Sequence, residues 1–233
     1  MTMIYTNRLL GLLVAAMFIP LLVNAQCETL SIPYSSSVKE GGKVVYQGPQ
    51  VFGLGWEENG AMAYMVHGVH QSTQTQYSLI LVQDMVTDNK IEMLYLDKDV
   101  DASYVHDPCS VMERSDVKEK LKKHKIQSSD LGVFHATRIY TPYQFKLVVE
   151  PTRFACSAGE KVDASKYALN FYRGEEFIKT IGSDVGGEEH LNILGYISSP
   201  LEDRLAVIVE TQMTACGKDK TFADIAIYGC KVN

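Results

Sequence analysis

The sequence predicts a mainly β fold, with antiparallel meander and hairpin sheets in a sandwich-like or partial propeller-like arrangement and one amphipathic helix over about residues 111–125. The first observation is the texture of the chain after residue 26. Short runs rich in Val, Ile, Tyr and Phe are separated there by Gly, Asn, Asp, Ser and Pro. The second observation is that a single segment carries the capping and charge pattern of a helix.

The chain begins with the features of a secretory signal peptide. A short basic start ending at Arg8 leads into the apolar run Leu9–Val23, and the leader closes with Val23-Asn24-Ala25, which places small residues at the positions that a signal peptidase reads. The apolar run is shorter than the roughly 20 residues that a membrane span needs. We therefore expect residues 1–25 to be cleaved after Ala25, leaving residues 26–233 as a single β-rich domain that is secreted or periplasmic and has no integral membrane segment. A lipid anchor on Cys27 is the less favoured alternative.

Four apolar runs form a first group of expected strands, and we expect them to pair in order as one antiparallel meander. Asn59-Gly60 lies between the first two runs, and both residues tolerate the positive φ of a tight hairpin turn. The four runs are Val51–Trp56, Ala61–Gly68, Tyr77–Met85 and Ile91–Leu96.

The expected helix follows this meander. Ser110 and Glu113 have the spacing of a capping box, and Val117 and Leu121 give the segment a narrow apolar stripe. Acidic residues lie early in the segment and lysines late, which matches the helix dipole. The one basic cluster of the chain, Lys118–Lys125, is therefore interpreted as a helix end rather than as a binding surface.

A second set of six runs follows the helix, and a faint internal repeat links it to the first set. Leu54-Gly55-Trp56 and the hairpin after it resemble Leu194-Gly195-Tyr196 and the hairpin after it. Two such units cannot close a propeller, which takes about four or more blades, so we interpret them as two related hairpins from packed sheets. The six runs are Tyr143–Glu150, Lys166–Tyr172, Phe177–Ile181, Ile193–Ile197, Arg204–Thr211 and Phe222–Tyr228.

The order of these features resembles a known family. The stretch Phe52-Gly-Leu-Gly-Trp-Glu-Glu-Asn-Gly-Ala-Met-Ala-Tyr64 is followed by Tyr77-Ser-Leu-Ile-Leu-Val-Gln-Asp84, the helix, the strand Tyr143–Glu150, a loop with Cys156 and a closing pair of strands. In this order the chain resembles a family of predicted secreted bacterial proteins classed as domain of unknown function 2259. The resemblance covers nearly the whole chain after the leader. It implies export and a β-rich domain, and it implies no known activity and no catalytic residues.

The five cysteines are widely spaced, without any C-x-x-C pair, so an exported chain is expected to use them in disulfides rather than in a zinc or redox site. At most two bridges can form within one chain, which leaves one thiol over. We expect Cys156 to pair with Cys216, because each lies in a loop after an outgoing strand. The second choice pairs Cys27 with Cys109 or with Cys230.

The composition restricts the classes of partner. The formal net charge is -6, which argues against nucleic acid and anionic lipid as natural partners. No cofactor is expected, because no nucleophile elbow, Walker loop or dinucleotide fingerprint is present. The thirteen tyrosines could line a glycan- or peptide-binding face, although most fall in strand runs where tyrosine is favoured for packing.

Two segments have spacings that suggest a metal site. His67 and His70 could ligate zinc or copper, but residues three apart on a strand point to opposite faces and no third ligand is nearby. Asp97–Asp101 begins like a calcium loop, and then Ala102 replaces the required glycine and Pro108 replaces the bidentate glutamate. We therefore predict no metal site.

Two kinds of nucleophile pattern are also present. Ser36 with Lys39 and Ser115 with Lys118 match S-x-x-K, in which a lysine could activate a serine, but neither has partner motifs. Cys109 lies near His106-Asp107, although in an oxidising compartment a bridged or buried thiol is the better interpretation. We therefore predict no catalytic residue in either place.

The sequence favours a binding or envelope accessory protein without catalytic activity, whose ligand is an unknown protein, a small molecule or a glycan. The alternative is a secreted hydrolase with dispersed catalytic residues, for which His67, His70, His106 and Asp107 are the first suspects. A deep pocket with convergent histidines and carboxylates would favour the hydrolase. A flat tyrosine-lined surface or a sheet edge would favour binding.

Overall fold

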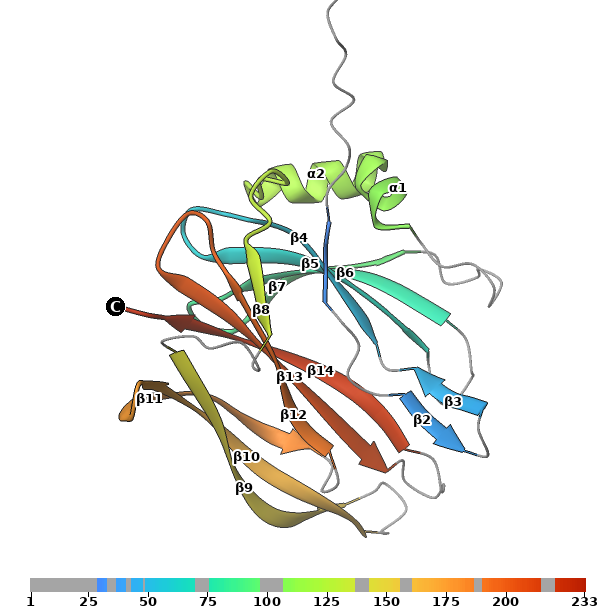
Figure 1. Ribbon diagram of the computed structural model, residues 1–233. Helices are drawn as coiled ribbons and strands as arrows, with labels where there is room; N and C mark the ends of the chain where they lie inside the picture. The colour runs from blue at the N-terminus through green and yellow to red at the C-terminus, as the bar shows by residue number, and fades with distance from the viewer. Residues whose placement is uncertain are drawn as a thin grey trace, which may run out of the picture.

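Three antiparallel sheets stack face to face, and two short helices cover one end of the stack (Figure 1). This arrangement is seen in a computed structural model of the chain. The model describes residues 29–32, 37–40, 43–47, 49–69, 76–96, 107–136, 143–155, 161–186, 190–214 and 221–233. Residues 1–25, which are expected to form a signal peptide, lie outside these described residues.

The first sheet has five strands in the order β1-β4-β5-β6-β7. Strands β2 and β3, between β1 and β4 in sequence, form a separate two-stranded sheet. Every neighbouring pair in the first sheet is antiparallel. The strands are β1 Leu30–Ser31, β2 Ser37–Glu40, β3 Lys43–Gln47, β4 Gln50–Trp56, β5 Ala61–Val69, β6 Gln76–Asp84 and β7 Lys90–Leu96.

The other two sheets come from the second half of the chain. A four-stranded sheet has the order β14-β13-β12-β8, and a three-stranded sheet has the order β11-β10-β9. Their strands are β8 Val133–Ala136, β9 Tyr143–Ala155, β10 Lys161–Arg173, β11 Glu176–Gly186, β12 His190–Ser198, β13 Arg204–Thr214 and β14 Thr221–Lys231.

The four-stranded sheet lies in the middle and is apolar on both faces. Ile208 of β13 faces the first sheet, where it packs in one cluster with Trp56 and Met62. Val207 of the same strand faces the three-stranded sheet, where it packs with Phe171 and Tyr196. This explains why residues 205–209 form an unbroken run of buried apolar side chains instead of an alternating one.

The predicted mainly β class and all ten predicted strands are confirmed, with boundaries that differ by a few residues. The first four predicted runs form the meander β4-β5-β6-β7. Asn59-Gly60 lies in the β4–β5 turn, closed by Gly60 N donating to Glu57 O at 3.0 Å. Four strands, β1, β2, β3 and β8, were not predicted.

The helix prediction is wrong in its start and in its continuity. The structure has α1 over Pro108–Glu113 and α2 over Ser115–Lys123. Asp107, not Ser110, caps α1, because the Asp107 carboxylate accepts from Ser110 N at 2.8 Å and Pro108 fits the first helical turn. Arg114 then adopts an extended conformation (ψ 137°), which ends α1 and begins α2.

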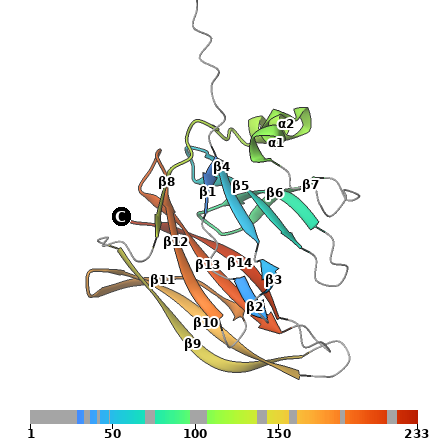
Figure 2. The same ribbon diagram turned by 45° about the vertical axis from the view of Figure 1, so that its right-hand side comes forward.

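Both helices lie on the outer face of the five-stranded sheet (Figure 2). Val117 and Leu121 of α2 provide the predicted apolar stripe, and both are buried against that sheet. Lysines lie in the last turn of α2, as predicted. Two of them also pair with the sheet, which was not predicted: Lys120 Nζ and Lys123 Nζ lie 2.8 and 2.7 Å from the Glu92 carboxylate on β7. No helix among the described residues is long and apolar enough to cross a bilayer.

The internal repeat corresponds to two hairpins from packed sheets, as predicted. The hairpin β4-β5 belongs to the first sheet and β12-β13 to the middle one. Each first strand has a register shift at its glycine, Gly55 or Gly195. A β-carbon on Gly55 would collide with the Gln127 carbonyl, and one on Gly195 would collide with the His135 carbonyl. Each glycine therefore lets a neighbouring segment approach the hairpin closely, the Gln127 segment at Gly55 and strand β8 at Gly195.

Buried polar side chains connect the first sheet to the middle sheet. Gln83 on β6 is 3% exposed, donates to the Ile227 carbonyl on β14 at 2.8 Å and accepts from the Tyr64 hydroxyl at 2.7 Å. Arg204 on β13 donates to the Met85 carbonyl at 3.1 Å and pairs with Glu202 at 2.6 Å. These bonds satisfy groups that the packed sheets remove from water.

Replacement of Gln83 by leucine tests this connection. Gln83→Leu keeps the side-chain size and leaves the Ile227 carbonyl and the Tyr64 hydroxyl without their partner, so we expect the free energy of unfolding to fall by about 2–3 kcal/mol. Urea unfolding measures the change. Gln144→Leu, at an exposed position on β9, should stay within about 0.5 kcal/mol of the parent protein. An equal effect of both variants would contradict the proposed role of Gln83.

The Glu92 cluster predicts a dependence of stability on pH. Hydrogen bonds from Lys120, Lys123 and His124 lower the pKa of Glu92 from 4.5 to about 2. A carboxylate with a lowered pKa in the folded state stabilises the fold above pH 4.5, and this contribution disappears as the pH falls toward 2. Glu92→Gln should therefore be less stable than the parent protein at pH 6, and the difference should vanish near pH 2.

The control for this experiment is Glu175→Gln, an exposed glutamate in the β10–β11 turn. The difference between this variant and the parent protein should be small at every pH. Urea midpoints measured from pH 6 to pH 2 for all three proteins give the comparison. A Glu92→Gln difference that stays constant over this range would show that the ion pairs do not stabilise the fold.

Candidate functional site

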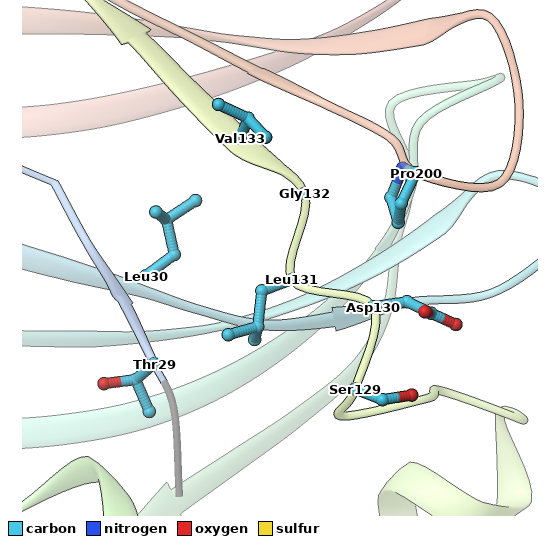
Figure 3. A pocket seen from close by; sticks show the side chains of 8 residues that line it. All are labelled: Thr29, Leu30, Ser129, Asp130, Leu131, Gly132, Val133 and Pro200. Atoms are coloured by element: carbon cyan, nitrogen blue, oxygen red, sulfur yellow. The ribbon is translucent and has the colours of Figure 1, made fainter.

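An open groove lies between β1 and the segment that leads into β8 (Figure 3). Its volume is about 660 Å³, within the range of small-ligand sites. Figure 3 shows the Leu131 side chain directed toward β1, which carries Leu30. The described lining residues are Thr29, Leu30, Ser129, Asp130, Leu131, Gly132, Val133 and Pro200.

The floor of the groove is a connection that crosses from the first sheet to the middle sheet. Gln127 N donates to Trp56 O at 2.9 Å, so the connection first lies beside the end of β4. Asp130 N then donates to Gln127 O at 3.0 Å and turns the chain. Val133 begins β8, which pairs with β12. The groove is therefore placed where the chain passes between two sheets.

Gly132 is required in this floor because a side chain there would enter the core. Its φ is 77°, and a β-carbon at this position would collide with the Ser198 carbonyl and lie 3.2 Å from Trp56 Nε1. Trp56 is 0% exposed, and within the described part of the chain its Nε1 has no hydrogen-bond acceptor. The single tryptophan of the protein thus lies directly behind the groove floor.

The chemistry of the groove suits binding. Leu30, Leu131, Val133 and Pro200 provide apolar surface, and Val133 is 57% exposed. Hydroxyls of Thr29 and Ser129 and the carboxylate of Asp130 are its polar side-chain groups. Asp130 is the one titratable side chain among the described lining residues, so they provide no acid–base pair of the kind that hydrolysis requires.

The candidate catalytic residues of the hydrolase alternative that the structure describes have structural roles. His67 on β5 is 8% exposed, and its Nδ1 lies 2.7 Å from Ser78 Oγ on β6. Asp107 is the cap of α1, and its hydrogen bonds from Ser110 lower the pKa of the carboxyl group. His70 and His106 lie outside the described residues. The described suspects are therefore not brought together in the groove.

Two of the five cysteines, Cys109 and Cys230, lie among the described residues. Cys230 on β14 is free and 1% exposed, so the predicted alternative of a Cys27–Cys230 bridge is wrong. Burial raises the pKa of the Cys230 thiol to about 11, which makes it unreactive in the folded protein. Cys109 is disulfide-bonded. Cys27, Cys156 and Cys216 lie outside the described residues, and the Cys156–Cys216 pairing stays a prediction.

The remaining motifs add no chemistry to the groove. Lys118 Nζ lies 2.6 Å from the Glu113 carboxylate, with which it forms an ion pair. Lys39 lies on strand β2, and Ser36 and the acidic segment 97–101 lie outside the described residues. No group of three or more metal-ligating side chains occurs in the described parts of the chain. Buried tyrosines such as Tyr167 and Tyr228 are packing residues.

Sequence reasoning did not find the groove. β1 has two residues and β8 has four, which is too short for a periodic pattern to stand out. Gly132 and Pro200 are turn signals in the sequence, and a turn signal gives no indication of which segment will lie opposite it.

The role of Gly132 can be tested with a matched glycine. Gly132→Ala combines a strained φ with a collision in the core, so we expect a loss of about 2 kcal/mol or more and a shift of the Trp56 emission. Gly174→Ala has a similar φ of 61°, and nothing lies within 4 Å of its β-carbon. It should cost about 1 kcal/mol and leave the emission unchanged. Equal losses in both variants would contradict the close packing at Gly132.

Comparisons with known proteins gave no relative of this chain. No family model matches it, and neither a curated protein nor a solved structure matches it. The resemblance to domain of unknown function 2259 therefore stays a prediction.

Proposed function

We propose that this chain is an exported binding protein without catalytic activity, acting in the periplasm or outside the cell, and that its ligand occupies the groove between β1 and residues 129–133. The observation that carries the proposal is the composition of the groove. Apolar side chains from β1, the crossing connection and the β12–β13 turn share one open hollow, in which Asp130 is the single titratable group among the described lining residues.

Two further observations support binding over hydrolysis. The described candidate residues for hydrolysis lie outside the groove and form hydrogen bonds there, His67 with Ser78 and Asp107 with Ser110. The groove is also supported by rigid elements, because its walls are attached to two packed sheets. A preformed apolar hollow on a rigid scaffold loses little conformational freedom when it binds a ligand. The leader-like residues 1–25 support export.

The native mass of the exported protein, purified without reductant, tests this function. We expect a chain beginning at Gln26 together with extra mass that disappears on denaturation. Leu131→Lys places a charged side chain in the apolar part of the groove, so we expect it to lose the extra mass at least tenfold. The matched control is Val148→Lys, at a position on β9 that is 48% exposed and outside the groove.

Retention of the extra mass by Leu131→Lys, with its loss in Val148→Lys, would place the ligand elsewhere and contradict the proposal. The hydrolase alternative requires turnover of an ester or peptide substrate that His67→Gln abolishes without unfolding the protein. Such a result would also overturn the non-catalytic function.

A further inference from the structure

We infer that the ligand of the groove is an extended polypeptide segment that adds as a strand to the open edge of β1, with apolar side chains at alternate positions and a basic side chain near Asp130. This inference rests on the proposed function and names the class of its ligand.

One edge of β1 carries backbone groups that no described strand pairs with. It is the terminal strand of the first sheet and pairs with β4 alone among the described strands. Ile32 N donates to Val51 O at 3.0 Å, and antiparallel pairing alternates residues that face the partner with residues that face away. Leu30 therefore faces β4, while the N–H and C=O groups of Thr29 and Ser31 point away from it.

The other side of the groove is also a sheet edge. β8 ends the middle sheet and pairs with β12 alone among the described strands. Val133, its first residue, lines the groove and is 57% exposed. A hollow between two sheet edges is the place where an incoming chain can form backbone hydrogen bonds that side-chain contacts cannot supply.

The side chains select what kind of chain fits. Leu30, Leu131 and Val133 offer apolar contacts to side chains on one face of a strand, since alternate residues of a strand share a face. Asp130 is the only charged side chain among the described lining residues. A lysine or arginine in the ligand would complement this carboxylate, whereas an acidic residue would be repelled.

The same lining argues against a glycan. Sugar rings stack on flat aromatic side chains, which supply broad contact area, and the described lining residues include none. Among these described residues, the polar side-chain groups are the hydroxyls of Thr29 and Ser129 and the Asp130 carboxylate. Backbone groups at the β1 edge are therefore the main hydrogen-bonding resource of the groove.

A titration with synthetic peptides tests the inference. The probe is an eight-residue peptide with blocked ends in which valine alternates with threonine and lysine, and the signal is the emission of Trp56, the only tryptophan, behind Gly132. We expect saturable binding. A peptide with glutamate in place of lysine should bind about two- to fivefold more weakly, and Asp130→Asn should remove that preference.

Strand addition is tested separately from occupancy of the groove. The same valine–lysine peptide, N-methylated on the amides of one edge, should bind at least tenfold more weakly, because it cannot pair with β1. In amide hydrogen exchange, the Thr29 and Ser31 amides should become protected by the parent peptide. Leu131→Lys should abolish both effects, and Val148→Lys should preserve them.

Peptide binding that N-methylation does not weaken, without protection of Thr29 and Ser31, would overturn strand addition. Absence of peptide binding would also overturn it. In either case the proposed function would still stand if the co-purified mass were lost in Leu131→Lys and kept in Val148→Lys. Loss of both results would remove the inference and the proposed function together.

Discussion

The middle sheet depends on being apolar on both faces, and the rest of the structure follows from this constraint. Residues 205–209 of β13 are all buried, and they point alternately toward the first sheet and toward the three-stranded sheet. Burial on both faces leaves no solvated side to which polar groups can turn. The two outer sheets must therefore supply matching apolar faces, and the few polar groups between the sheets must be paired, as Gln83 and Arg204 are.

The crossing of residues 126–133 is the second consequence of the stack. A chain that passes from the first sheet to the middle one must approach both, and glycines make room for it: Gly55 accommodates Gln127 of the crossing, and Gly195 accommodates His135 of the β8 strand that follows. The two hairpins therefore share a structural feature as well as a sequence pattern, because each has a glycine against which a neighbouring backbone carbonyl packs. The groove lies along the same path, because the crossing segment separates β1 from β8 and cannot fill the space between them.

The long strands could be predicted from the sequence, whereas the short strands could not. Ten strands of seven or more residues were found from their apolar runs, because each run carries enough residues to show a pattern. β1 and β8 pair through only a few residues, and their positions are set by β4 and β12, which are distant in sequence. The start of the helix was misplaced because Asp107, three residues before Ser110, is an equally good capping residue in the sequence. The groove was missed with β1 and β8, since it consists of their open edges and of the connection between them.

The shortness of these two edge strands also explains how a protein can leave a binding edge open. A long, exposed edge strand is a template for aggregation, and proteins restrict this risk by keeping edges short or interrupted. β1 has two residues, and β8 has four and follows directly from the turn at Gly132. Such edges offer too few backbone groups for two copies of the chain to join by strand pairing alone. An incoming segment must therefore also satisfy the apolar side chains and Asp130, so the short edges that reduce aggregation make side-chain contacts necessary for binding.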